Sequence, residues 1–462
     1  MRLRLLSPRA LGLTGSLMLA AFAPMAPSRA ATWSAPATLS SPASFVDHPF
    51  IDFGTSGEGL ATWGYTIGTG PGSVFGLRAA RRAATGQFGA ERELPVRVVR
   101  FALYGRERVV AVSQRDEGAR RDLGVAFGST TGGIGAARSI DRFTSVPGYG
   151  NWPELAANDR GDVAVVYLQR VRGGRRAVTL AQRRPGRRFA APRIVASRGR
   201  GAFGVTVALD ARGDLVVAWQ RGHWVEARVR RHGGRLGPIQ RLGWTVAQDT
   251  RLHAAVAPNG AVWVAWDAQL TTEGGDNGPF TIRVATRPAD ARAFRPARVL
   301  ERNDHRASEE SRVDLALDPA GAAFITWPGW DGAHARARLA TLTADGRTAN
   351  IRTLSQPGYD AAVRDVATGR RPGEALVVWA RLDAVGELGT QVLAGPVAPN
   401  GAYAGEEAVS DADRARLPAA AFDPVTGAPI VVWSQRIGPD GPGVPVAQVR
   451  TVLRAATRSP TP

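Results

Sequence analysis

Several residue types and patterns are missing from this sequence of 462 residues, and each absence excludes a class of structure or site. There is no cysteine, so neither disulfide bonds nor thiolate metal sites are available. No apolar run is long enough to form a transmembrane helix. Glycine or proline interrupts nearly every ten residues, which excludes solenoids built from long amphipathic helices.

Catalytic and metal-binding motifs are missing as well. The six histidines show no paired spacing of the kind that metal sites use. The chain has neither a G-x-S-x-G nucleophile elbow nor a phosphate-binding loop. We therefore expect no metal, no cofactor and no catalytic residue, and we favour a protein that is not an enzyme.

The charge of the chain is strongly one-sided. No lysine is present, so the 59 basic residues are all arginines, and the formal net charge is +19. Between residues 169 and 241, eighteen arginines stand against three acids. Such a sector would attract a polyanion, and the attraction would weaken with salt. A GC-rich coding bias would give the same composition, so the sequence leaves both explanations open. Aromatic residues suited to base stacking are few, so specific nucleic-acid recognition is not expected.

The first thirty residues have the layout of a secretory signal. Three arginines precede an apolar run from about Ala10 to Ala23, and small residues follow up to Ala30. We expect cleavage near Ala30, one folded domain over residues 31–455 and a disordered tail over residues 456–462. Four arginines and no acids would leave with the signal, so the secreted, monomeric protein would carry a net charge of +15.

The main organising feature is a repeated phrase, best seen in DARGDLVVAW from Asp210 to Trp219. It combines an Asp-x-x-Gly turn with an apolar run that ends in an aromatic residue. Seven copies have a glycine six residues before the aromatic, and an eighth, irregular copy ends at Ser113. The ends of the copies are 50, 54, 52, 47, 61, 52 and 54 residues apart. Periods of this length, with short apolar runs between turns, indicate the blades of a β-propeller.

Each repeat is predicted to contain four strands, a to d. In the fourth repeat these are Val205–Leu209, Leu215–Trp219, Trp224–Val229 and about Leu236–Leu242. The turn aspartate should accept a hydrogen bond from the backbone two residues on, and the glycine should supply a positive φ. The tryptophan that ends strand b is interpreted as a packing residue between blades.

The last repeat has no d strand, because the chain ends soon after strand c. A d-type phrase, TWSAPATLS, stands alone from Thr32 to Ser40. We therefore predict that the N-terminal strand completes the last blade and closes an eight-bladed ring, which leaves no open sheet edge. Seven blades is the alternative if the second repeat is irregular.

These phrases resemble those of secreted bacterial, especially actinobacterial, β-propeller repeat proteins. The resemblance covers essentially the whole mature chain and implies a propeller fold but little about activity. Sialidases are the nearest well-understood comparison, and their Asp-box has the aspartate five residues before the tryptophan. Here Asp210 precedes Trp219 by nine residues, and the Arg-Ile-Pro opening motif is missing. No sialidase catalytic residue can be carried over.

The candidate ligand-binding residues lie where the b–c and d–a loops are expected to share one face. They follow the b strands or precede the a strands, and most are arginines that could bind carboxylate or phosphate groups. They are Arg115, Arg170, Arg221, Arg251, Arg312, Arg364, Arg381, Arg436, His48 and Trp152. Solvated strand ends would look the same.

Acidic loops offer weaker alternatives. The loop from Asp267 to Phe280 has oxygen ligands for Ca²⁺, but not at the spacing of a known calcium loop. Asp267 or Asp304 could face Glu309 or Glu310 as a carboxylate pair for glycoside cleavage.

Three functions follow from these residues. The first is an exported, non-enzymatic propeller that binds an anionic glycan, a wall polymer or a protein partner through its arginine-rich loop face. The second is a glycan-acting hydrolase or lyase, which needs two convergent carboxylates. The third is a structural scaffold.

Overall fold

In the computed structural model, every regular element that is described is a β-strand. The structure describes residues 32–68, 73–94, 98–117, 120–144, 152–196, 202–246, 250–270, 279–303, 313–346, 348–382, 389–403, 405–411, 414–438 and 450–459. The expected secretory signal lies outside these residues, as does most of the proposed calcium loop. Within the described residues, no helix is long and apolar enough to cross a membrane.

The strands follow the predicted repeats, which we number as units 1 to 8. Unit 1 contains β2 (Phe45–Phe53), β3 (Gly59–Ile67), β4 (Val74–Arg82) and β5 (Phe88–Glu93). Unit 2 contains β6 (Val98–Tyr104), β7 (Arg108–Glu117), β8 (Arg120–Ser129), β9 (Gly133–Ile134) and β10 (Arg138–Thr144). Unit 3 contains β11 (Glu154–Ala157), β12 (Val163–Arg170), β13 (Arg176–Arg183) and β14 (Arg193–Ala196). Unit 4 contains β15 (Ala202–Leu209), β16 (Leu215–Arg221), β17 (Trp224–Arg230) and β18 (Gln240–Trp244).

The second half of the chain continues the pattern. Unit 5 contains β19 (Leu252–Val256), β20 (Val262–Gln269), β21 (Phe280–Arg287) and β22 (Arg298–Asn303). Unit 6 contains β23 (Asp314–Leu317), β24 (Ala323–Trp330), β25 (Ala335–Leu342) and β26 (Thr348–Thr353). Unit 7 contains β27 (Asp360–Thr368), β28 (Ala375–Leu382), β29 (Gly389–Val397) and β30 (Glu407–Ala408). Unit 8 contains β31 (Ala415–Phe422), β32 (Pro429–Ile437), β33 (Arg450–Thr457) and the N-terminal strand β1 (Ala37–Thr38).

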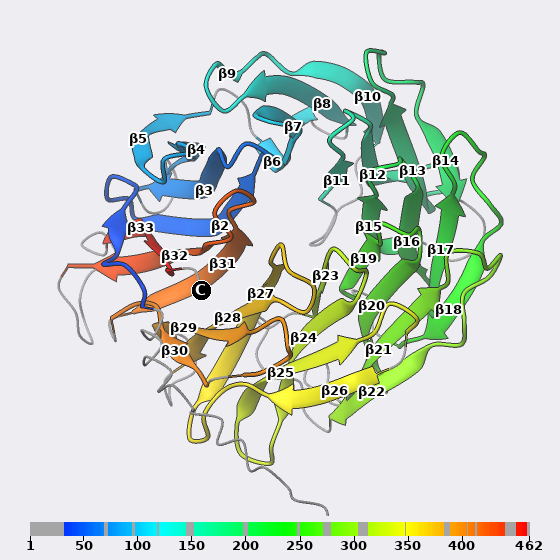
Figure 1. The fold of residues 1–462 in the computed structure, drawn as a ribbon. Helices are drawn as coiled ribbons and strands as arrows, with labels where there is room; N and C mark the ends of the chain where they lie inside the picture. Colours follow the sequence, from blue (N-terminus) through cyan, green and yellow to red (C-terminus); the bar gives the residue numbers. More distant parts are fainter. Residues whose placement is uncertain are drawn as a thin grey trace, which may run out of the picture.

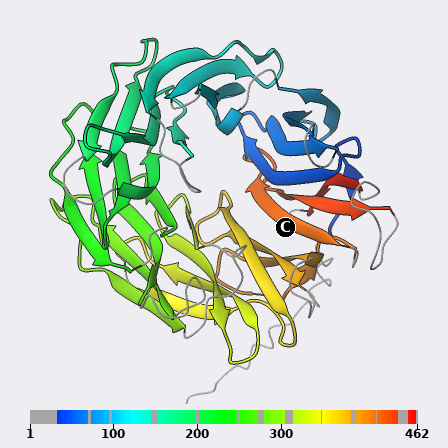
Figure 2. The same ribbon diagram turned by 180° about the vertical axis from the view of Figure 1, so that it is seen from behind.

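Every strand pair in these units is antiparallel, and the units are arranged around a central axis (Figures 1 and 2). The strands form six four-stranded sheets and one nine-stranded sheet. The nine-stranded sheet contains units 2 and 3, which are joined by a single residue pair between β10 and β12, Thr144 and Arg170. The predicted β-propeller is therefore confirmed, whereas the number of blades stays a prediction.

The turn between strands a and b forms as the sequence predicts. In unit 4, Asp210 Oδ1 accepts hydrogen bonds from the backbone N–H of Arg212 (2.9 Å) and of Asp214 (2.7 Å). Gly213 has a φ of 90°, in the region that favours glycine. The carboxylate and the glycine together close a tight connection between β15 and β16.

The core consists of apolar side chains packed between neighbouring units. The aromatic residues that end the b strands are fully buried, which confirms their interpretation as packing residues. They are Trp63, Tyr167, Trp219, Trp266, Trp327, Trp379 and Trp433. Trp219, for example, packs with Val166 and Leu168 of the preceding unit.

The N-terminal strand closes the ring as predicted. β1 pairs with β33 in the register Ala37–Ala455 and Thr38–Arg454, so unit 8 has four strands taken from both ends of the chain. The backbone N–H of Leu39 donates to the Leu453 carbonyl at 2.8 Å, and the Leu39 side chain is buried in the unit 1–unit 8 core. Figure 1 shows the blue first strands beside the red last strand.

Two predicted boundaries differ from the structure. β33 continues to Thr457, and Arg458 forms ion pairs with Glu407, so the sheet extends into the segment expected to be a tail. Strand d of unit 4 begins at Gln240 and not near Leu236. The cause is Pro238, which has no N–H to donate to a neighbouring strand.

Candidate functional site

An arginine-lined cavity of about 520 Å³ lies between units 3 and 4. Its walls come from the c–d turns of both units, and its apolar lining includes Val163, Leu180 and Leu209. Seven arginines and one aspartate line it, which gives a formal net charge of +6. The arginines are Arg183, Arg184, Arg187, Arg188, Arg193, Arg230 and Arg235.

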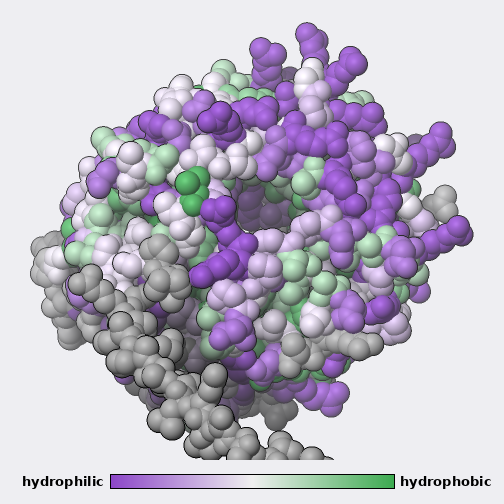
Figure 3. All heavy atoms as spheres, in the orientation of Figure 1, coloured by the Kyte–Doolittle hydropathy of each residue, from purple (hydrophilic) through white to green (hydrophobic). Residues whose placement is uncertain are grey.

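All seven arginines belong to the basic sector between residues 169 and 241 that the sequence analysis singled out. The c–d turns place them on the face opposite the b–c loops, where we had not expected a site. Hydrophilic residues also gather over the upper right of the ring in Figure 3, where Figure 1 places β10 to β17.

Arg230 is the last residue of β17 and the main candidate for binding a ligand in the cavity. Its guanidinium donates to Gln182 Oε1 (2.9 Å) and to the Gly213 carbonyl (3.2 Å), which are both uncharged acceptors. Its Nε is buried without a hydrogen-bond partner among the described residues. Desolvation, followed by the charges of Arg193 and Arg184, lowers the pKa of Arg230, and the charges of Asp162 and Asp214 offset this only in part. A bound anion would relieve both the charge repulsion and the unsatisfied N–H.

The repeats provide an internal comparison for Arg230. Arg82 has the same position in unit 1. Arg82 lies opposite Gly59, the first residue of β3, and Arg230 lies opposite Leu215, the first residue of β16. Arg82 is buried and forms an ion pair with Asp423, the first residue of the a–b turn in the preceding unit (2.9 Å). In the unit that precedes Arg230, the corresponding turn residue is Asn158, which is uncharged. Arg230 therefore lacks the carboxylate that its counterpart has.

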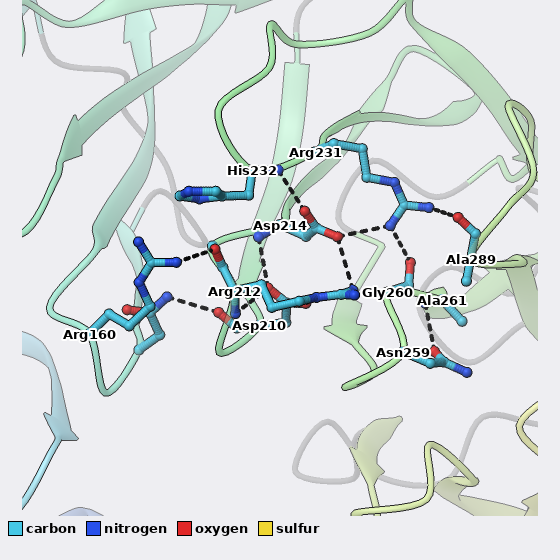
Figure 4. Close-up of polar contacts among 12 residues, drawn as sticks. Arg160, Asp210, Arg212, Asp214, Arg231, His232, Asn259, Gly260, Ala261 and Ala289 are labelled. Atoms are coloured by element: carbon cyan, nitrogen blue, oxygen red, sulfur yellow. Dashed lines mark hydrogen bonds and ion pairs between the residues drawn. The ribbon is translucent and has the colours of Figure 1, made fainter.

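A hydrogen-bond network fixes one wall of the cavity (Figure 4). Asp214 Oδ2 binds Arg231 (2.9 Å) and Arg212 (3.2 Å), and Asp214 Oδ1 accepts the backbone N–H of His232 (2.6 Å). Arg231 also donates to the Gly260 carbonyl of unit 5 at 2.8 Å. The turn that presents Gly233, Gly234 and Arg235 to the cavity is thus tied to both neighbouring turns.

The outer arginines of the cavity are exposed and carry charge that other groups do not neutralise. The described residues provide no ion pair to the side chains of Arg184, Arg187, Arg188 and Arg235. Arg193 donates to Gln182 Oε1 at 2.8 Å, an acceptor that it shares with Arg230. The cavity thus presents several guanidinium groups to a ligand, and guanidinium binds carboxylate, sulfate and phosphate groups in a bidentate manner.

A second polar cluster lies on the innermost strands, around the central hollow seen in Figure 3. His253 on β19, Asp314 on β23 and Asp365 on β27 share one level, because each lies opposite a residue next to a b-strand tryptophan. His253 Nδ1 is 2.9 Å from Asp314 Oδ1, and Asp314 and Asp365 are hydrogen-bonded to each other.

The surroundings shift the pKa values of the two carboxyl groups of this cluster in opposite directions. Burial raises the pKa of Asp365 well above its usual value, and the nearby Asp314 adds to the rise. Burial acts on Asp314 in the same direction, but His253 reverses it and lowers the pKa of Asp314. Their carboxylates also accept the backbone N–H groups of Val366 (3.1 Å) and Ala420 (2.8 Å) on the next inner strands. The sequence analysis missed this pair, because only the pairing of the strands brings residues 51 apart to one level.

The ten predicted binding residues have varied surroundings. Arg115, Arg170 and Trp152 are exposed, as is His48, which has a φ of 46° and lies 3.6 Å from Asp47. Arg221 binds the buried Glu226 at 2.5 Å, and Arg381 lies 4.8 Å from the ring centre of Tyr359.

The remaining four are less accessible or not described. Arg251 and Arg364 are half-buried, and the backbone N–H of Arg251 donates to Asp267 Oδ1 at 3.0 Å. Partial burial, with Arg414 and Arg416 nearby, lowers the pKa of Arg436. Arg312 lies outside the described residues, as do Asp304, Glu309 and Glu310 of the proposed carboxylate pairs.

Metal binding has no support in the described part of the chain, where no group of three His, Asp or Glu side chains is arranged to hold an ion. Among the loop residues considered for calcium, Asp267 instead accepts the hydrogen bond from Arg251.

No protein-family model and no curated protein matches the sequence. Solved structures with a similar arrangement include prolyl oligopeptidase B from Galerina marginata, with 9% identity and a TM-score of 0.45 over 85% of this chain and 55% of that one. An ulvan lyase, described as a new family of polysaccharide lyase, has 11% identity and a TM-score of 0.46 over 78% of this chain and 92% of its own. The NanB sialidase from Streptococcus pneumoniae has 11% identity and a TM-score of 0.37 over 94% and 71%.

These three proteins are enzymes by name, but at such identities and TM-scores no residue role and no activity carries over to this chain. The chain spans little more than half of the prolyl oligopeptidase. The assignment of the propeller fold rests on the strand pairing described above.

Proposed function

We propose that this protein is an exported, non-enzymatic propeller that binds an acidic extracellular polymer through the arginine-lined cavity between units 3 and 4. The observation that carries the proposal is Arg230, a half-buried guanidinium with an unsatisfied Nε and no ion-pair partner among the described residues. In unit 1 the counterpart Arg82 is neutralised by Asp423, whereas Arg230, like Arg183 and Arg287 at the same position of units 3 and 5, has no ion pair among the described residues.

The binding mode follows from the lining. An acidic group of the ligand would enter between Arg230 and Arg193 and replace uncharged acceptors with a charged one. The exposed Arg184, Arg187 and Arg188 would hold neighbouring acidic groups, and the apolar lining would contact the uncharged parts of the chain. Because guanidinium is weakly hydrated, these contacts cost less desolvation than contacts from ammonium groups would.

Export is part of the proposal. It is supported by the signal-like first thirty residues and by the resemblance of the repeats to secreted bacterial propeller proteins. Detection of the processed chain in the culture medium, with Ala31 as its first residue, would be the matching observation.

The test is a charge-matched comparison of variants. Binding of polyphosphate and of polygalacturonate is measured by titration calorimetry in 50 mM salt. Arg184→Gln, Arg187→Gln and Arg188→Gln are combined in one variant, and Arg106→Gln, Arg292→Gln and Arg298→Gln in a control that removes the same charge from exposed arginines elsewhere. We expect the first variant to bind roughly tenfold to a hundredfold more weakly and the control to change by less than about threefold. Equal losses of affinity in both variants would show that the ligand responds only to the net charge of the protein, and would reject the cavity as the binding site.

A single substitution tests the role of Arg230 without removing any arginine. Asn158→Asp would place a carboxylate where Asp423 lies relative to Arg82, but it also replaces the amide that donates to Asp162 Oδ2 and to the Asp210 carbonyl. We expect this variant to unfold at a lower temperature than wild type and, while folded, to lose most of its affinity for both polymers, because the new carboxylate would neutralise Arg230. Unchanged affinity would show that Arg230 does not bind the ligand.

A second candidate function is cleavage of a glycan, which two observations favour and one disfavours. Asp314 and Asp365 converge in the centre of the ring, and their surroundings shift the two carboxyl pKa values apart, that of Asp365 upward and that of Asp314, beside His253, downward. However, a glycosidase needs its carboxyl groups about 5 Å or more apart, and these two are hydrogen-bonded to each other. Release of reducing ends from polygalacturonate that is abolished by Asp314→Asn would show that the protein is a glycan-cleaving enzyme. If no reducing ends are released, the binding function remains the proposal. The third possibility, a scaffold, would show as stable oligomers on sedimentation.

A further inference from the structure

Two tryptophans at the other end of unit 4 form an exposed aromatic pair. Trp224 begins β17 and Trp244 ends β18, and the two residues lie directly opposite each other across the strands. Their exposed fractions are 39% and 38%, whereas all seven fully buried tryptophans pack within the core. Exposed surface on two adjacent tryptophans is energetically unfavourable for a protein that has no ligand to cover it.

Charged groups surround this pair in an arrangement suited to an acidic sugar. The Arg241 guanidinium lies 5.0 Å from the centre of the Trp224 ring and is 62% exposed. Arg241 Nε is 3.8 Å from Glu226, a buried carboxylate that also binds Arg221 at 2.5 Å. His223 lies against the other tryptophan, with its ring centre 5.8 Å from that of Trp244.

The ring of Trp224 is thus covered in part by a cation, and Trp244 is flanked by the imidazole of His223. A sugar ring presents apolar C–H groups that can stack on an indole, and the indole face also attracts cations. A carboxylate on that sugar would reach Arg241, because this guanidinium has a long contact to Glu226 and solvent on its other side. A polyanion without rings, such as polyphosphate, would gain nothing from the tryptophans.

We infer that Trp224, Trp244 and Arg241 form a second ligand site, which stacks on the rings of a uronic-acid polysaccharide. The inference rests on the proposed function for the acidity of the ligand, and it narrows the ligand class from any polyanion to an acidic polysaccharide. Trp224 and Arg230 lie on the same face of β17, six residues and roughly 20 Å apart, so a polymer of several sugars is needed to engage both sites.

The test compares three ligands: polygalacturonate, polyphosphate of similar charge and neutral amylose. Trp224→Ala and Trp244→Ala are each expected to weaken polygalacturonate binding about tenfold and to leave polyphosphate binding within about twofold of wild type. Trp224→Phe, which keeps an aromatic face, should recover most of the affinity. Phe75→Ala is the matched control, because Phe75 is an aromatic residue with 68% exposure in unit 1.

The outcomes separate this inference from the function on which it rests. Loss of both polymers in the alanine variants, or of neither, would overturn the second site. If wild-type protein binds polygalacturonate in a tryptophan-dependent manner and the variant with glutamine at positions 184, 187 and 188 binds it equally well, the aromatic site stands and the cavity proposal fails. Equal tryptophan-dependent binding of amylose would show that the site does not read the carboxylate and would overturn the assignment to uronic acids.

Discussion

At the scale of single residues, buried charges are arranged to join neighbouring units. Asp423 accepts the backbone N–H groups of Val425 (2.8 Å) and Thr426 (3.2 Å) and binds Arg82 across the closure of the ring. Burial would raise the pKa of Asp423, but these hydrogen bonds and the arginine lower it. Because both side chains are almost fully buried, each depends on the other for its charge to be tolerated.

The first prediction concerns this ion pair. Asp423→Asn keeps an acceptor for the turn but leaves the Arg82 charge uncompensated, so we expect a loss of about 3–5 kcal/mol in the free energy of unfolding. Urea denaturation measures it. Arg371→Gln, which breaks an ion pair whose arginine is 47% exposed, should cost less than about 1 kcal/mol. Similar costs for both variants would contradict the assignment of a buried, interdependent pair.

The second prediction concerns Asp52, an inner-strand carboxylate that joins units 1 and 2. Its oxygens accept the N–H groups of Phe53 and Leu103, both at 2.8 Å, and burial raises the pKa of Asp52 to about 6. A raised carboxyl pKa in the folded state means stability that is fully present below about pH 4 and is lost as the pH rises through about 6.

Asp52→Asn mimics the neutral form, so we expect it to be more stable than wild type at pH 8 by about 1–2 kcal/mol. The full shift would give more, but the side chain is only half-buried by surface area. The difference should vanish near pH 4. Unfolding curves at pH 4, 6 and 8 test this, with Asp290→Asn, at an exposed position, as the control. A difference that does not change with pH would count against the raised pKa.

At the scale of elements, the N-terminal strand has the largest structural consequence for its length. β1 has two residues, yet it covers the edge of β33 and places Leu39 in the core between units 1 and 8. Without it, β33 would present unpaired N–H and C=O groups to solvent, which favours pairing with other chains.

The third prediction follows from that edge. A chain that begins at Ser41 should unfold roughly 5–10 °C lower than the chain that retains residues 32–40, and it should aggregate on heating. A synthetic peptide of residues 32–42, added in excess, should restore part of the difference, whereas a scrambled peptide should not. Differential scanning calorimetry gives both readouts. An unfolding temperature that truncation leaves unchanged would show that the closure contributes no stability.

The same scale shows what the sequence could and could not predict. Strands a to c of unit 4 were predictable because each lies between glycine or proline turns, whereas the start of strand d was predicted too early because Pro238 precedes it. The closure was predictable because one d-type phrase is displaced to the N-terminus. The cavity was not, because Arg82 and Arg230 look alike in sequence. Only strand pairing shows that one faces Asp423 and the other a unit whose turn begins with Asn158.

At the scale of the whole molecule, folding sorts the two signs of charge. Among the described residues, the buried acids are Asp162, Asp210, Asp214, Glu226, Asp318 and Asp423, whereas Arg82 is the single buried arginine. The acids are used in turns and between units, so the surface is more basic than the composition alone indicates. A coding bias can account for the number of arginines, but their gathering around one cavity is a property of the fold.

The last prediction measures this surface through salt. Each arginine that binds an acidic group releases a counterion, so the logarithm of the binding constant should fall linearly with the logarithm of salt concentration. For polyphosphate, five arginine contacts predict a slope of about −3.5 to −4.5, and therefore a roughly 100- to 500-fold loss of affinity between 50 and 200 mM salt. The variant with glutamine at positions 184, 187 and 188 should have a slope smaller by about 2–3, one for each missing contact, whereas the control variant at positions 106, 292 and 298 should keep the wild-type slope. Both variants carry the same net charge, so a slope that changes equally in the two would mean that the ligand senses the overall charge of the ring and not the cavity between units 3 and 4.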